Sequence, residues 1–268
     1  MNTFISQDGS QIAYKQTGSG QAMILVHGAS DDHTSWAPLL PFLTHHFSVY
    51  AMDRRGRGGS QVEGDYSIQR EFEDVAGLVE EVHRRAPNRP INLFGYSFGG
   101  YCCLEAALLT NHIDNLVIFE PPPVGNPEAL PPGLLSKLQQ LFDLGDHEGM
   151  LCVFFQELVG VSDKELAVLR SNHSWPDRVA AAHTILREIK ATINQPHFDP
   201  NRYQDITLRT ILLVGRKSPP NTWSIVQEIH SALPNSQIVA LPTQGHMAID
   251  HKPKVIADHV LALLLESK

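Results

Sequence analysis

Short apolar runs alternate along the chain with longer segments of helical periodicity. We expect strands at residues 22–26, 47–52, 91–95, 116–119, 211–215 and 237–241. Segments with apolar positions every three or four residues lie between them, at about 36–45, 68–85, 98–109, 225–233 and 254–265. This alternation is typical of parallel strands joined by helical crossovers, and therefore of a doubly wound α/β sheet. Near the start, residues 4–6 and 12–15 predict a hairpin at the edge of the sheet.

The stretch that follows Glu120 has a different pattern. Prolines flank a loop directly after it, and the residues from there to about Tyr203 show helical periodicity without a convincing strand. We therefore predict two parts. Residues 1–120 and 206–268 form an α/β core, and residues 121–205 form a helical cap (lid) of three or four amphipathic helices.

Ser97 lies in a glycine-rich segment, Gly95–Gly100, between an apolar run and a helical segment. Small residues two positions before and after a serine let the chain turn sharply from a strand into a helix, and the hydroxyl is then pushed out above the sheet. A glycine-rich turn that merely caps a helix has the same pattern. Two further motifs, residues 27–30 (His-Gly-Ala-Ser) and 244–247 (Gln-Gly-His-Met), each follow a strand-like run and favour a nucleophile elbow at Ser97.

These motifs, together with Trp36 and the segment 53–60 (Asp-Arg-Arg-Gly-Arg-Gly-Gly-Ser), resemble the α/β-hydrolase fold family, specifically its compact bacterial serine esterase-like members. They span nearly the whole chain. The resemblance implies an α/β-hydrolase fold, which is a mostly parallel eight-stranded sheet with helices on both faces and an inserted helical cap after the sixth strand. It also implies a serine nucleophile and a histidine base on a late loop.

The resemblance assigns roles to four residues at the carboxyl edge of the sheet. Ser97 is expected to be the nucleophile, and His246, in a loop after the last strand, is expected to be the base that activates it. By family precedent, the backbone N–H groups of Ala29 and Phe98 form the oxyanion hole. The alternative for His246 is a surface histidine, since the chain holds 14 histidines.

The acid of the catalytic triad departs from the commonest family pattern. That acid usually follows the seventh strand as Gly-x-x-Asp, but residues 215–218 read Gly-Arg-Lys-Ser. Some family members, notably among haloalkane dehalogenases, carry their acid at the end of the sixth strand, where this chain has Glu120. We therefore assign the role to Glu120, which would accept a hydrogen bond from His246 and fix its tautomer. The alternative is that Glu120 caps the loop or faces the cap.

Composition excludes several other classes of protein. The 268 residues are 42% hydrophobic, which is enough for one α/β core, and a formal charge of −8 argues against a nucleic-acid-binding surface. The first residues do not resemble a leader, and no apolar run approaches the roughly 18 residues of a membrane span. We therefore expect a cytoplasmic protein with a small-molecule substrate and no membrane partner. Three cysteines without a spacing pattern indicate reduced thiols rather than metal ligands, and nothing in the pattern indicates an oligomeric state.

The leading hypothesis is a cofactor-independent carboxylesterase for small or medium esters, with an acyl-enzyme on Ser97 and no metal ion. A carbon–carbon bond hydrolase, a lactonase and a perhydrolase remain open on the same residues, as do a lyase and a ligand receptor with little turnover. The arginines of segment 53–58 either reach an anionic substrate or brace neighbouring turns, and we favour the second interpretation. Asp31, Asp32 and His33 resemble a metal cluster only superficially.

Overall fold

The computed structural model describes residues 1–62 and 64–265, and in this part of the chain the strands form one eight-stranded sheet. The strand order is β1-β2-β4-β3-β5-β6-β7-β8. The hairpin of β1 and β2 is antiparallel and pairs antiparallel with β4, while all later pairings are parallel. The strands are β1 Asn2–Ile5, β2 Gln11–Gly18, β3 Gln21–Val26, β4 Phe47–Met52, β5 Ile91–Tyr96, β6 Asn115–Phe119, β7 Arg209–Gly215 and β8 Ser236–Leu241.

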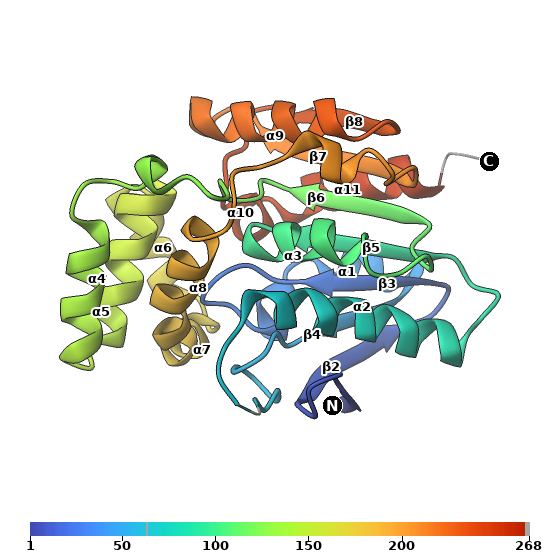
Figure 1. Ribbon diagram of the computed structural model, residues 1–268, viewed down its shortest axis with the longest axis horizontal. Coiled ribbons are helices and arrows are strands. Elements are labelled where there is room, and N and C mark those ends of the chain that lie inside the picture. The colour runs from blue at the N-terminus through green and yellow to red at the C-terminus, as the bar shows by residue number, and fades with distance from the viewer. Residues whose placement is uncertain (63, 266–268) are drawn as a thin grey trace.

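Helices cover both faces of this sheet (Figure 1). Helices α2, α3 and α9 pack on one face, and α1, α10 and α11 pack on the other, so that each face has its own buried apolar cluster. The predicted mostly parallel eight-stranded sheet with helices on both faces is confirmed. These core helices are α1 Leu40–Leu43, α2 Ile68–Arg85, α3 Phe98–Ala106, α9 Pro220–Ala232, α10 Ala248–His251 and α11 Pro253–Leu265.

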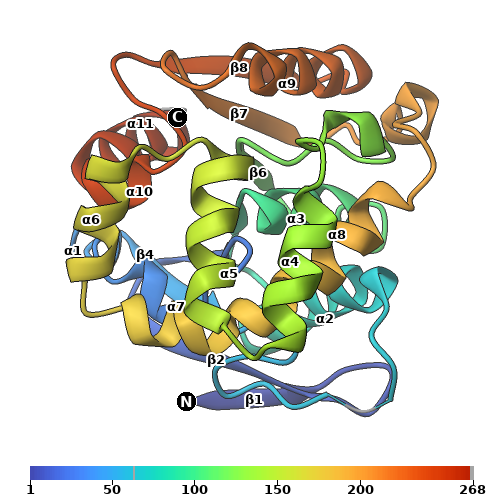
Figure 2. The ribbon, with the colours of Figure 1, turned by 90° about the vertical axis from the view of Figure 1, so that its left-hand side faces the viewer.

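The segment 121–205, which we call the cap, is helical and lies at one end of the sheet (Figures 1 and 2). Its side chains form a third buried apolar cluster, separate from the two clusters on the sheet faces. Met247, which belongs to the loop after β8, is also part of this third cluster. The α-helices of the cap are α4 Leu134–Asp143, α5 His147–Val153, α6 Asp163–Ser171, α7 Trp175–Ala181 and α8 Ile185–Ile193, and a π-helix at Phe154–Val159 continues α5.

One predicted helix is much shorter in the structure. The periodicity predicts a helix over about 36–45, but the chain forms a 3₁₀ turn at His33–Trp36 and a single helical turn, α1. Pro38 and Pro41 explain the difference, because each lacks the backbone N–H that a longer helix needs at that position. None of the helices in the described part of the chain combines the length and the apolar character that crossing a membrane requires.

Candidate active site

Ser97 is the residue that joins β5 to α3, and its backbone has φ 52° and ψ −123°. A positive φ costs free energy in a residue with a side chain, so the surroundings must hold this turn in place. Small neighbours make the turn possible. A Cβ at Gly99 would overlap the carbonyl oxygen of Val26, and a Cβ at Gly28 would lie 3.2 Å from the Cβ of Ser97. The glycines therefore reflect the close approach of two chain segments, the turn at Ser97 and the end of β3 with the loop after it.

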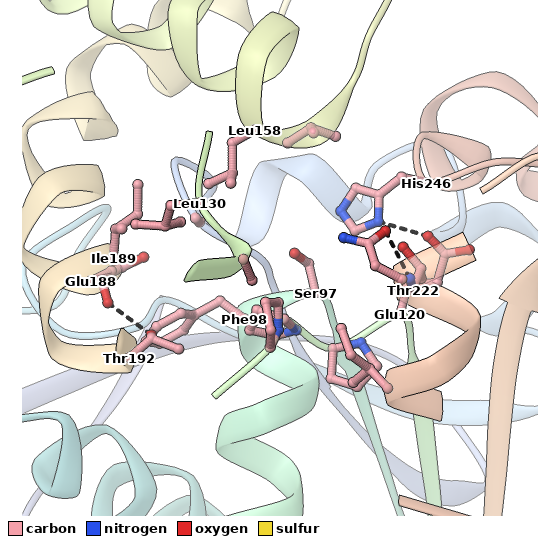
Figure 3. Close-up of a pocket in the computed structure, with 18 of the residues that line it drawn as sticks. Ser97, Phe98, Glu120, Leu130, Leu158, Glu188, Ile189, Thr192, Thr222 and His246 are labelled. Atoms are coloured by element: carbon pink, nitrogen blue, oxygen red, sulfur yellow. Dashed lines mark hydrogen bonds and ion pairs between the residues drawn. The ribbon is translucent and has the colours of Figure 1, made fainter. Parts of the chain in front are cut away.

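Ser97 and His246 line the same cavity, which has a volume of about 150 Å³. Figure 3 shows the hydroxyl of Ser97 and the ring of His246 directed at one open space. A cavity of this size can hold a ligand as large as benzene. The remaining wall is largely apolar and comes from the cap and from α9, including Leu130, Phe154, Leu158, Ile189, Ile193 and Ile225.

Glu120 directly follows β6 and lines this cavity, next to the end of β7. Its Oε2 is 2.8 Å from Nδ1 of His246, and its Oε1 accepts hydrogen bonds from the backbone N–H of Gly215, at 2.7 Å, and from the hydroxyl of Ser218, at 2.6 Å. Burial by itself raises the pKa of Glu120, but the hydrogen bond and the electrostatic interaction with His246, with the two donors to Oε1, hold this pKa below its ordinary value. Glu120 is therefore a carboxylate at neutral pH.

The ionised state of Glu120 fixes the tautomer of His246. A carboxylate can only accept hydrogen bonds, so Nδ1 of His246 must carry the proton that it shares with Glu120. The other ring nitrogen, Nε2, is then free to accept a proton, and Figure 3 shows it on the side of the ring that faces Ser97. This arrangement suits a base for the Ser97 hydroxyl.

The loop that carries His246 is held from two sides. On the sheet side, the hydroxyl of Tyr96 donates a hydrogen bond to the carbonyl oxygen of His246 at 3.0 Å. On the cap side, the next residue, Met247, packs among the apolar side chains of the cap. The position of the imidazole therefore depends on both parts of the molecule.

Ala29 and Phe98 both line the cavity beside Ser97. Phe98 is the first residue of α3, so its backbone N–H has no acceptor within the helix. The positive end of the helix dipole lies at the same place and favours a negative charge there. Ala29 follows Gly28, which lies against the side chain of Ser97. The structure thus brings together all five residues that the sequence assigns to the site: Ala29, Ser97, Phe98, Glu120 and His246.

The arginines of segment 53–58 are buried in ion pairs. Arg54 pairs with Glu71 and with Glu188 of the cap, Arg55 pairs with Asp74, and Arg57 also pairs with Glu188. None of these three guanidinium groups lines the cavity. The structure therefore supports the bracing role that we favoured over an anion-binding role.

Three potential metal ligands lie together at Asp32, His33 and Asp53, with their ligand atoms within 4.8 Å of one another. Hydrogen bonds already use these atoms, since Oδ1 of Asp53 contacts both the backbone N–H and Nδ1 of His33, at 2.8 and 2.7 Å. Asp31, which the sequence places beside this pair, points elsewhere and pairs with Arg178 of the cap.

Sequence reasoning missed Ser218 and Arg178. Ser218 occupies the position of the aspartate in the Gly-x-x-Asp pattern, and here its hydroxyl donates a hydrogen bond to Glu120. Its place in that pattern was the sequence feature that could have indicated a role near Glu120. Arg178 is a buried cap residue whose guanidinium lies 2.9 Å from a carboxylate oxygen of Asp31 and 2.9 Å from one of Asp250. No pattern along the chain indicates that bridge, because it depends on how the cap sits on the core.

A family model described as the alpha/beta hydrolase fold matches residues 21–253. The chain therefore belongs to the α/β-hydrolase fold family, as its motifs and its sheet indicate.

Individual relatives agree with this assignment. The uncharacterized hydrolase YugF of Bacillus subtilis (strain 168) is 21% identical over 267 residues, which cover 94% of each chain. Among solved structures, an alpha/beta hydrolase from Sphaerobacter thermophilus DSM 20745 is 31% identical, with a TM-score of 0.81 over 97% of this chain and 98% of that one. A thermophilic esterase from Thermogutta terrifontis shares the fold at 23% identity, with a TM-score of 0.73 over 99% of this chain and 98% of that one.

Proposed function

We propose that this protein is a cofactor-independent serine hydrolase, a carboxylesterase for small or medium esters. The observation that carries the proposal is the 2.8 Å contact between Glu120 and His246 at the edge of a cavity that Ser97 also lines. A serine hydroxyl is a poor nucleophile near neutral pH, and a carboxylate-oriented imidazole is a common means of activating it. The apolar cavity of about 150 Å³ suits a short acyl chain or a small alcohol.

The reaction follows from the geometry in two steps. The Ser97 oxygen attacks the ester carbonyl carbon while Nε2 of His246 takes the hydroxyl proton, and the N–H groups of Ala29 and Phe98 stabilise the negative oxygen. The C–O bond to the alcohol then breaks, and His246 gives its proton to the departing oxygen. In the second step the water oxygen attacks the acyl carbon while His246 takes a proton from it, and then the bond from that carbon to the Ser97 oxygen breaks, His246 returns the proton to this oxygen, and the carboxylic acid leaves.

A labelling experiment tests the nucleophile. A fluorophosphonate probe should add one adduct mass to the wild-type protein, located by peptide mapping at Ser97, and should add none to Ser97→Ala. An adduct on a different residue, or no adduct on folded wild type, would contradict the proposal.

A substrate series tests the reaction class. We expect turnover of p-nitrophenyl acetate and butyrate, and a decline towards longer chains as the acyl group exceeds the cavity. Labelling without turnover of any ester would instead favour a receptor or a different bond type, which a lactone and an aryl amide in the same panel would distinguish. Localisation in the cytoplasm is also a proposal, and cell fractionation tests it.

A further inference from the structure

The peptide bond between Gly28 and Ala29 is held from its carbonyl side. The oxygen of Gly28 lies 2.9 Å from Nη1 of Arg54 and 2.9 Å from Nδ1 of His27. The backbone N–H of Arg54 donates to Nε2 of His27 at 3.1 Å, so Nδ1 of the neutral ring carries the proton and donates to Gly28. Because a trans peptide is planar, with its C=O and N–H pointing in opposite directions, anchoring the oxygen sets the direction of the Ala29 N–H.

The same guanidinium contacts the second donor residue of the proposed oxyanion hole. The Cζ atom of Arg54 lies 4.3 Å from the centroid of the Phe98 ring, in the geometry of a cation–π contact. Arg54 therefore contacts the peptide group that carries the Ala29 N–H, through the oxygen of Gly28, and also the side chain of Phe98.

Arg54 is itself fixed by two carboxylates from different parts of the molecule. Its Nε and Nη2 atoms bind the two oxygens of Glu71, on α2, at 3.2 and 3.0 Å, and Nη2 also binds Glu188 at 2.7 Å. The Arg54 side chain is fully buried. Glu188 belongs to α8 of the cap and lines the cavity, so the wall that meets the substrate is joined by one ion pair to the oxyanion hole.

We infer that Arg54 is a positioning residue that aligns the Ala29 and Phe98 N–H groups for the transition state, and that Glu188 of the cap completes its alignment. The inference rests on the proposed function. A buried guanidinium at this place supplies a rigid, planar set of donors, which a lysine ammonium cannot reproduce. Loss of that alignment weakens binding of the transition state more than binding of the substrate.

Arg55 provides a matched control. It is the next residue, it is equally buried, and it also binds two carboxylates, Asp74 at 2.6 and 2.8 Å and Asp8 at 2.9 Å. Neither it nor these two partners line the cavity. Arg54→Met and Arg55→Met therefore remove similar buried ion pairs, and only the first removes a contact with the oxyanion residues.

The measurement compares two inhibitors and the steady-state constants. A trifluoromethyl ketone adds to Ser97 and places a negative oxygen in the hole, whereas the matching alcohol cannot. In Arg54→Met we expect kcat and the affinity for the ketone to fall together by about tenfold to hundredfold, with KM and the affinity for the alcohol nearly unchanged. In Arg55→Met all four quantities should stay within about threefold of wild type, measured on the folded fraction.

Equal losses in the two variants, or equal losses of ketone and alcohol affinity, would overturn the inference. If Arg54→Met does not fold, Arg54→Lys and Glu188→Gln replace it in the comparison with Arg55→Met. In both we expect smaller decreases in kcat and in the affinity for the ketone, again with little change in KM or in the affinity for the alcohol. If the wild-type protein neither reacts with the fluorophosphonate probe nor hydrolyses an ester, the proposed function itself is wrong. A reactive wild type with no difference between the variants rejects only the role of Arg54.

Discussion

The core and the cap hold their charged groups in different ways. In the core, Glu120 directly follows β6 and receives hydrogen bonds from the end of β7, from Ser218 and from His246. The cap instead contacts the core through long side chains, such as Arg178, which forms ion pairs with Asp31 and Asp250. The register of the sheet fixes the first set of contacts, whereas the second set depends on how the cap packs on the core.

This difference suggests a division of labour. Groups fixed by the sheet can meet the precise geometry that a catalytic step needs. The bridge through Arg178 lies outside the cavity wall and fastens the two parts together, while apolar cap side chains shape the cavity. The following predictions test that division, beginning with the largest effect.

The first prediction concerns the core carboxylate. Glu120→Gln should lower kcat by about 10³- to 10⁴-fold, or roughly 4 to 5.5 kcal/mol, because the neutral amide neither fixes the tautomer of His246 nor stabilises the imidazolium. Steady-state kinetics on a p-nitrophenyl ester, with a thermal melt to verify folding, measures this. Ser218→Ala, which leaves the carboxylate in place, should lose only about tenfold. A near-normal rate in Glu120→Gln would remove Glu120 from the triad.

The second prediction concerns the cap bridge. Arg178→Met should lower the free energy of unfolding by about 3 to 5 kcal/mol, since it leaves the carboxylates of Asp31 and Asp250 buried without their partner. Arg170→Met, at the largely exposed ion pair with Glu148 on the cap surface, is the control and should cost under about 1 kcal/mol. Urea titrations of both variants provide the comparison. Equal costs would show that the cap is not fastened through Arg178.

The third prediction concerns pH. Burial, together with the nearby charges of Asp250 and Asp32, raises the pKa of Asp31 to about 6 despite the opposing charge of Arg178. The carboxyl of Asp31 has a pKa of about 3.9 in the unfolded chain, so between about pH 4 and pH 6 the folded protein binds more protons than the unfolded chain. The contribution of Asp31 to the free energy of unfolding is therefore fully present below this range and is lost as the pH rises through it. The wild type should lose about 2 to 3 kcal/mol from pH 4 to pH 7 relative to Asp31→Asn. Parallel pH dependences in the two proteins would contradict this.

The smallest predicted effect concerns the cavity wall. Leu158 lines the cavity, so Leu158→Ala should shift the preference in kcat/KM towards longer acyl chains, by about 1 kcal/mol per added methylene that the new space accepts. Leu144→Ala, at an exposed leucine of the same cap, should leave the preference unchanged. A series of p-nitrophenyl esters measures both variants. The absence of any shift in Leu158→Ala would mean that the acyl chain does not meet this wall.

Much of the core was predictable because its signals are local. The apolar runs of the parallel strands are continuous, so the strand at Phe47–Met52 and the helix at Ile68–Arg85 fall where the periodicity predicts them. The alternation of elements also predicts that β6 and β7 are neighbours with their carboxyl ends at one edge, and therefore that Glu120 lies near the loop that carries His246.

The rest was not predictable because it depends on packing between distant segments. Helical periodicity in the cap shows that its helices have an apolar face, but not what that face covers. Phe154 and Trp175 both belong to the apolar cluster of the cap, but only Phe154 also lines the cavity. The contact between Arg54 and Glu188 joins residues 134 positions apart, and the sequence around either residue does not indicate its partner.

The packing of Met247 inside the cap has a practical consequence for protein engineering. Exchanging the cap for that of a relative is an obvious route to new substrates, yet here Met247, directly after the proposed base His246, is buried among the apolar side chains of the cap. A transplanted cap that lacks a pocket for the Met247 side chain would no longer hold the His246 loop, and the imidazole could move away from Ser97. A chimera of this kind should therefore recover activity only when residue 247 and its new surroundings are redesigned as a unit.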